Sequence, residues 1–229
     1  MITRNGNIVV YYNSEDVRYL DKLISILSLR IPKISEFFKI NFNDDIIVKL
    51  YSDLNAYKNN LVSSFEKNAQ RESQEVGYEI SPRKYEEWMI ANTEDSNINM
   101  QSLDLVRSQE DFKDYTEEEF CYNACHEFVH LCQEMVNSEN PAWFWEVIVT
   151  TIGNPECQHD TSDNFTLKDM DNFDSIDGYG ACYTLGKYLF ANYDSNFILS
   201  MIKDNRIFND NIGTIISEVN NNSNRKSRF

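Results

Sequence analysis

The sequence predicts an α+β fold, in which a small mixed β-sheet with packed helices precedes a mainly helical half. Glycine and proline are scarce, with 7 and 4 among 229 residues, which disfavours a turn-dense all-β sandwich. Short β-rich runs lie in the first half, whereas the pattern from residue 116 onwards is helical. We expect one domain over 1–229, with a sheet-containing lobe at 1–115 and a helical lobe at 116–229.

The first half alternates strand and helix patterns. Residues 8–12 form a β-rich run, and Ser14 can cap the helix that follows. An apolar stripe of helical period extends this helix to residue 38, and Pro32 is expected to break or kink it. The later elements expected in this half are a strand at 46–51, a short helix at 53–62, a polar loop at 63–74, strands at 77–80 and 85–91, a turn at 92–97 and a strand at 98–106.

The second half begins with Thr116 and Glu119, which have the spacing of a capping box. The helix that they start is expected to reach residue 135 or 136. Asn140 and Pro141 predict the start of the next helix, with the proline at its first position. That helix is expected to end at residue 152. A polar loop at 153–175, a helix at about 180–193 and shorter helices are expected after it.

Charge and composition disfavour some classes of binding partner and indicate a cellular compartment. The net charge of -16 disfavours nucleic acid and anionic membrane surfaces, which repel a polyanion. No stretch approaches the ~20 apolar residues of a membrane span, and no signal peptide is recognisable at the start. The five cysteines lack C-x-x-C spacing and fit small core residues in a reducing compartment. We therefore expect a cytoplasmic protein, with secretion left open and the oligomeric state undetermined.

Residues 126–130 read His-Glu-Phe-Val-His, which is the pattern H-E-x-x-H. On a helix, His126 and His130 lie one turn apart on the same face, so both rings can bind one ion about 2.0–2.1 Å away. Glu127 lies about 100° around the helix from His126, where it can take a proton from metal-bound water. The helix around them is apolar nearly all round, so these buried polar side chains need partners. The pattern predicts a site for one zinc ion.

A catalytic zinc usually has three protein ligands and one open position. Glu146 is the preferred third ligand, because it lies in an apolar stretch of the next helix, which an antiparallel return would bring over the first. Its alternative role is a solvent-facing side chain on an amphipathic helix. His159, in the polar loop, is the other candidate ligand. Gln133 and Val136 stand where metzincins carry glycine and a third histidine, which excludes that class.

The H-E-x-x-H pattern followed by PAWFWE resembles the gluzincin branch of zinc peptidases. It is most similar to short peptidase-MA-like proteins related to the catalytic core of aminopeptidase-N-type enzymes. Pro141, Trp143 and Glu146 match the family's second motif, P-x-W-x-x-E-G-x-A, although Val147 replaces its glycine. The resemblance implies a zincin-like fold, with the active-site cleft between the two lobes and Glu146 as a zinc ligand.

A third stretch, YGACYTLGKYL, resembles the tyrosine-led helix of the same family. In that group the leading tyrosine hydrogen-bonds the tetrahedral oxyanion, which implies this role for Tyr179. Tyr183, one turn further along, is the runner-up. The alternative for both is a helix that packs aromatic residues into the core.

Two departures from the family narrow the prediction. Thermolysin-like members place an aspartate four residues after the ligand glutamate to orient a histidine, whereas this chain has Thr150 there, a weaker neutral acceptor. No stretch resembles the GAMEN motif with which aminopeptidases anchor a free amine. An endopeptidase is therefore favoured, and the strand at 98–106, if it lies at a sheet edge, could pair with an extended peptide.

The combined prediction is a zinc metallopeptidase that hydrolyses peptide bonds of a peptide or protein substrate. Zinc polarises the scissile carbonyl, and Glu127 takes a proton from the attacking water and delivers it to the leaving amine. The alternative is a catalytically silent zinc-binding regulatory or interaction protein with the same fold. A purely structural helical protein is a third possibility, which leaves the buried His-Glu-His cluster unexplained.

Overall fold

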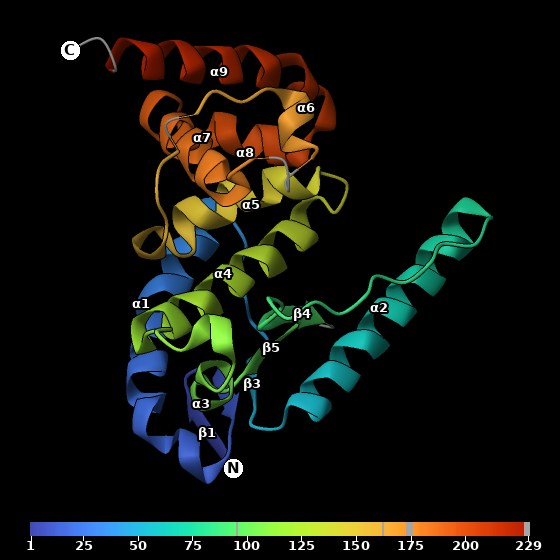
Figure 1. The fold of residues 1–229 in the computed structure, drawn as a ribbon, viewed down its shortest axis with the longest axis vertical. Coiled ribbons are helices and arrows are strands. Elements are labelled where there is room, and N and C mark those ends of the chain that lie inside the picture. The colour runs from blue at the N-terminus through green and yellow to red at the C-terminus, as the bar shows by residue number, and fades with distance from the viewer. Residues whose placement is uncertain (95, 162, 173–175, 227–229) are drawn as a thin grey trace. The chain divides into compact units, whose positions relative to one another are not determined.

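The computed structural model describes residues 1–229 except 95, 162, 173–175 and 227–229 (Figure 1). It is a mixed α+β structure, as the sequence predicts. The chain forms two compact units. The first unit comprises Met1–Ser28 and Phe42–Ala124, and the second comprises Leu29–Asn41 and Cys125–Phe229. The single catalytic domain expected over 1–229 stays a prediction.

The first unit contains a five-stranded mixed sheet in the order β1-β2-β3-β5-β4. Its β1–β2 and β4–β5 pairs are antiparallel, whereas β2–β3 and β3–β5 are parallel. The polar strand β4 lies at one edge, where only one of its sides must be paired. The strands are β1 (Ile2–Asn5), β2 (Ile8–Tyr11), β3 (Ile46–Tyr51), β4 (Ala91–Glu94) and β5 (Asn97–Gln101).

The strand expected at 98–106 is shorter in the structure. Its strand part is β5, which ends at Gln101, and Ser102 then caps the short helix α3 (Leu103–Arg107) by accepting from the Leu105 N–H. Because β5 lies between β3 and β4, both of its edges are paired, and the expectation that it binds an extended peptide is wrong. The expected turn at 92–97 begins instead with β4, and residues 77–90 contain no strand.

Helix α2 (Leu54–Val76) is one long helix where a short helix at 53–62 and a polar loop at 63–74 were expected. Asp53 caps it by accepting from the Ala56 N–H, and Gly77 ends it in a left-handed conformation with φ 78°. Buried residues at helical spacing, such as Tyr57 and Leu61, hold one face while the polar face is solvated. A polar stretch between two good caps therefore remains helical.

Helix α1 (Val17–Phe38) is continuous through Pro32, so the expected break does not occur. The apolar stripe is buried on both sides of the proline, including Leu27 and Ile34, which keeps the helix in register. Asn13, rather than Ser14, occupies the N-cap of the preceding 3₁₀ turn, and its N–H donates to the Asp16 carboxylate at 2.8 Å.

Helix α4 (Glu117–Val136) begins at the expected capping box. The Thr116 N–H donates to the Glu119 carboxylate at 2.6 Å, and the Glu119 N–H donates to the Thr116 hydroxyl at 3.1 Å. The later elements are α5 (Ala142–Ile152), the 3₁₀ turn η3 (Pro155–Cys157), α6 (Leu167–Met170), α7 (Gly178–Asn192), α8 (Ser195–Lys203) and α9 (Asn205–Lys226).

Two helix starts in the second unit differ slightly from expectation. Pro141 is the N-cap of α5 rather than its first helical residue. Asp177 caps α7 by accepting from the Gly180 N–H, so this helix starts two residues early and contains Tyr179 in its first turn. Among the helices of the described residues, none combines the length and apolar character that a membrane crossing requires.

Candidate metal centre

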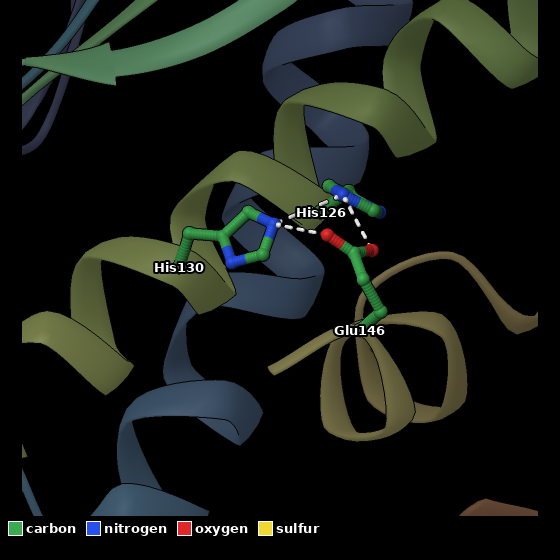
Figure 2. Close-up of side chains that lie close together, drawn as sticks. All are labelled: His126, His130 and Glu146. Carbon is green, nitrogen blue, oxygen red and sulfur yellow. Dashed lines mark hydrogen bonds and ion pairs between the residues drawn. The ribbon is translucent and has the colours of Figure 1, made fainter. Parts of the chain in front are cut away.

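Helices α4 and α5 bring three side chains of the second unit together (Figure 2). His126 and His130 project from α4 on one face, as their four-residue spacing predicts. Glu146 reaches them from α5, so the expected third side chain lies at the site. One nitrogen from each ring and one carboxylate oxygen all lie within 4.8 Å of one another.

The distances among these atoms fit a tetrahedral ion. The two Nε2 atoms are 3.2 Å apart. Glu146 Oε1 lies 3.4 Å from His130 Nε2, and Oε2 lies 3.6 Å from His126 Nε2. Ligands at about 2.0–2.1 Å from a tetrahedral zinc are separated by roughly 3.3 Å. The two imidazole nitrogens therefore have about the separation of two ligands of one ion, and each carboxylate oxygen lies near that separation from one of them.

An amide oxygen lies on the far side of each ring. His130 Nδ1 lies 3.2 Å from Gln133 Oε1, and His126 Nδ1 lies 3.3 Å from Asn154 Oδ1. Each amide oxygen can accept a proton from Nδ1, and the Glu146 carboxylate can accept one from Nε2. With a cation between the Nε2 atoms, both of these nitrogens would present lone pairs to it and each Nδ1 would carry the proton.

Burial and charge shift the pKa values of the site. Burial lowers the pKa of His126 to about 4, although the charge of Glu146 opposes this. Burial also acts to lower the pKa of His130, but the contact with Glu146 outweighs it, so the pKa of His130 is raised. Burial raises the pKa of Glu127 to about 7, opposed by His130 and reinforced by Glu146. The pocket therefore keeps at least one imidazole neutral and able to bind a metal.

The C-terminal end of α5 is held against α4 at His126. Gly153 ends α5, and a Cβ at this position would lie 2.9 Å from His126 Cα. The Arg30 guanidinium donates to the carbonyls of Ile152 and Gly153 at 2.9 and 3.3 Å, which caps the helix. Asn154, the ring partner of His126, follows directly. The close packing thus fixes a ligand and its partner together.

No family model, curated protein or solved structure matches this chain. The gluzincin resemblance therefore remains an expectation from the motifs, and the chemistry of the site is argued from its own residues.

The other expected site residues lie as follows. Glu127 is buried, with 7% of its surface exposed, beside the charges of His130 and Glu146. Tyr179 is 40% exposed in the first turn of α7, and its role as oxyanion donor stays a prediction. The Tyr183 ring lies under the Lys187 ammonium at 5.3 Å.

His159 and Thr150 have other partners. His159 Nε2 lies 2.8 Å from Asp177 Oδ2 on the surface, and the metal-ligand group found among the described residues does not include it. The Thr150 hydroxyl donates to the Glu146 carbonyl at 2.7 Å within its own helix. The two amides that contact the rings, Gln133 and Asn154, were not predicted as site residues. Gln133 follows His130 by three residues on α4, a spacing that makes the two side chains neighbours on a helix. Asn154 lies just beyond α5, where no local pattern relates it to His126.

Proposed function

We propose that this chain is a zinc-dependent metallopeptidase of the gluzincin type with a zincin-like fold. The observation that carries the proposal is the convergence of His126, His130 and Glu146, which each place one ligand atom within 4.8 Å of the other two. Imidazole nitrogens with one carboxylate are the ligand set typical of a catalytic zinc with an open position. The amide oxygens beside both Nδ1 atoms support the same conclusion, because they can accept the Nδ1 protons and leave both Nε2 atoms for a metal.

The chemistry follows from the buried carboxylate next to the ligands. A zinc ion held there would polarise a carbonyl and lower the pKa of a bound water to about 7. Glu127, the neighbour of a ligand in sequence, is the proposed base that takes the proton of the attacking water and delivers it to the leaving amine. Burial raises its pKa to about 7, which suits both steps near neutral pH.

The proposed substrate is an internal bond of a peptide or protein, because no amine-anchoring motif is present in the sequence. Tyr179 is the proposed oxyanion donor, and its exposure leaves the ring accessible to a substrate. The net charge of -16 favours basic peptides over acidic ones by long-range attraction. The cytoplasmic location stays a prediction.

The test combines metal analysis with cleavage of a peptide library. We expect purified protein to bind one zinc ion per chain and to cleave peptides in a manner that a chelator abolishes. Glu127→Gln is expected to keep the zinc and to lose activity by about 10²–10⁴-fold, the usual contribution of an acid–base group. Activity of the variant within a few-fold of wild type would exclude Glu127 as the base.

The alternatives give different results in the same experiment. A catalytically silent zinc protein binds the metal without cleaving any peptide. A purely structural cluster binds no zinc, because a protonated His130 paired with Glu146 then satisfies the site. Zinc content separates the structural cluster from the two zinc proteins, and peptide cleavage separates the peptidase from the silent zinc protein.

A further inference from the structure

We propose that Gln133 and Asn154 are positioning residues that hold His130 and His126 as Nδ1–H tautomers, with both Nε2 lone pairs aimed at one point. The inference rests on the proposed metal function for its purpose, but the ring orientation can be tested without metal. The two amides stand on the opposite side of the rings from Glu146. The family resemblance had offered only Thr150, a weaker acceptor, at the orienting position.

Gln133 carries the stronger part of the argument. Its side chain is fully enclosed, with 1% of the residue exposed. Its Nε2 donates to the Trp145 carbonyl at 3.1 Å, and a carbonyl can only accept. The amide oxygen must therefore face His130 Nδ1, at 3.2 Å. One side chain thus links a ligand ring on α4 to the residue directly before the ligand Glu146 on α5.

Asn154 plays the matching role for His126. Its Oδ1 lies 3.3 Å from His126 Nδ1, and the residue is 7% exposed. The backbone before it is held by the Arg30 guanidinium on the Ile152 and Gly153 carbonyls. The partner of His126 is therefore fixed by the end of α5 rather than by a residue within the helix.

Thr150 and Asn154 differ in what they contact. The Thr150 hydroxyl donates to the Glu146 carbonyl one turn earlier and to the Val147 carbonyl at 3.4 Å, both within its own helix. The oxygen that faces His126 Nδ1 belongs instead to Asn154, four residues later.

Neutral amides suit the charge of this pocket. Glu127 and Glu146 are two carboxylates next to the rings, and a divalent cation would balance both. A carboxylate in place of either amide would add a third negative charge in a buried site, at a desolvation cost. An amide oxygen accepts the Nδ1 proton without adding charge.

The test measures the tautomers directly in metal-free protein. Long-range proton–nitrogen NMR at alkaline pH, where the rings are neutral, distinguishes Nδ1–H from Nε2–H in each imidazole. We expect Nδ1–H at both rings in the wild type. In Gln133→Met the new side chain has nearly the same length but cannot accept a proton from Nδ1. The His130 ring should then be a mixture of the Nδ1–H and Nε2–H tautomers. Asn154→Leu should do the same at His126.

The same variants are then titrated with zinc against a chelator. Loss of a ring partner should weaken zinc binding by about 10–100-fold. Gln133→Glu should restore the Nδ1–H tautomer of His130, because a carboxylate also accepts that proton. Gln70→Leu, on the exposed face of α2, is the matched control and should change neither reading. Far-ultraviolet circular dichroism confirms that each variant is folded.

The outcomes separate this inference from the proposed function. Nε2–H at either ring of the wild type overturns the inference, as does an unchanged tautomer and zinc affinity in both Gln133→Met and Asn154→Leu. A protein that shows the expected tautomers and binds no zinc refutes the proposed function alone. A protein that cleaves peptides with zinc, but whose ring tautomers and zinc affinity do not change in Gln133→Met and Asn154→Leu, refutes the inference alone.

Discussion

Substitution of Gly153 by alanine tests the packing that aligns the metal ligands. Gly153 has φ -82° and ψ -57°, a helical conformation that alanine adopts without strain. Any loss of stability or zinc affinity in Gly153→Ala must therefore come from contacts of the added methyl group, since the change of glycine to alanine otherwise stabilises. That group would lie 2.8 Å from the Val149 carbonyl oxygen and 2.9 Å from His126 Cα. Both neighbours are backbone atoms, which cannot rotate away.

The size of the effect follows from these distances. Carbon atoms pack at about 3.5–4.0 Å, so the 2.9 Å contact with His126 Cα requires a shift of roughly 0.6 Å. Metal–ligand distances tolerate about 0.2 Å. The shift also moves Asn154 away from the His126 ring. We expect zinc affinity to fall by about 10–100-fold, as for loss of an outer partner. Overpacking should lower the free energy of unfolding by about 1–3 kcal/mol.

The assay is a zinc titration against a chromophoric chelator, with urea unfolding of the metal-free protein in parallel. Gly213→Ala is the control, because its Cβ would meet only Leu167 Cδ1 at 3.7 Å. This change within α9 should raise the free energy of unfolding by about 0.4–1 kcal/mol. Wild-type zinc affinity and stability in Gly153→Ala would refute the reasoning that close packing at this residue positions His126.

Three further predictions concern the ligand set and its support. Glu146→Gln removes the ligand charge at nearly constant shape, and a chelator competition should show a loss of zinc affinity beyond the about 10–100-fold cost of an outer-shell partner. Arg30→Met removes the guanidinium from the α5 carbonyls and should lower the free energy of unfolding, measured in urea, by about 1.5–3 kcal/mol. Arg206→Met is the control, because it breaks an exposed ion pair and should change the free energy of unfolding by no more than about 0.5 kcal/mol. Zinc at 100 times its dissociation constant should stabilise the fold by about 2.7 kcal/mol, and this gain should vanish with a chelator or at acid pH, where protonated imidazoles release the metal. Equal thermal midpoints with and without zinc would contradict the last prediction.

Much of the fold and part of the candidate site follow from local patterns. The four-residue spacing of His126 and His130 places both rings on one face of any helix, and α4 is that helix. The capping box at Thr116 and Glu119 forms as expected because it needs only its own turn. The helix that carries Glu146 was also predictable, since its boundaries depend on a proline and an apolar run.

Local patterns failed where a polar segment is stabilised by its ends or its neighbours. The polar stretch after Leu61 is helical in α2, because caps at Asp53 and Gly77 and one buried face suffice. The strand expected at 98–106 ends at Gln101, because Ser102 caps a helix there. Composition alone does not distinguish a solvated helix from a loop, or a strand end from a helix start.

The sequence by itself determined that His126 and His130 share one face of a helix, because their four-residue spacing fixes this, and it indicated Glu127 and Glu146 as candidates for the base and the third ligand. Only the tertiary structure decided how those groups are held. Glu146 meets the histidines through the packing of α5 on α4, and Asn154 reaches His126 from beyond the end of α5, whereas Gln133 is a helical neighbour of His130. The physical reason is that hydrogen bonds and close packing between helices depend on distances in space, which the order of residues along the chain does not reveal.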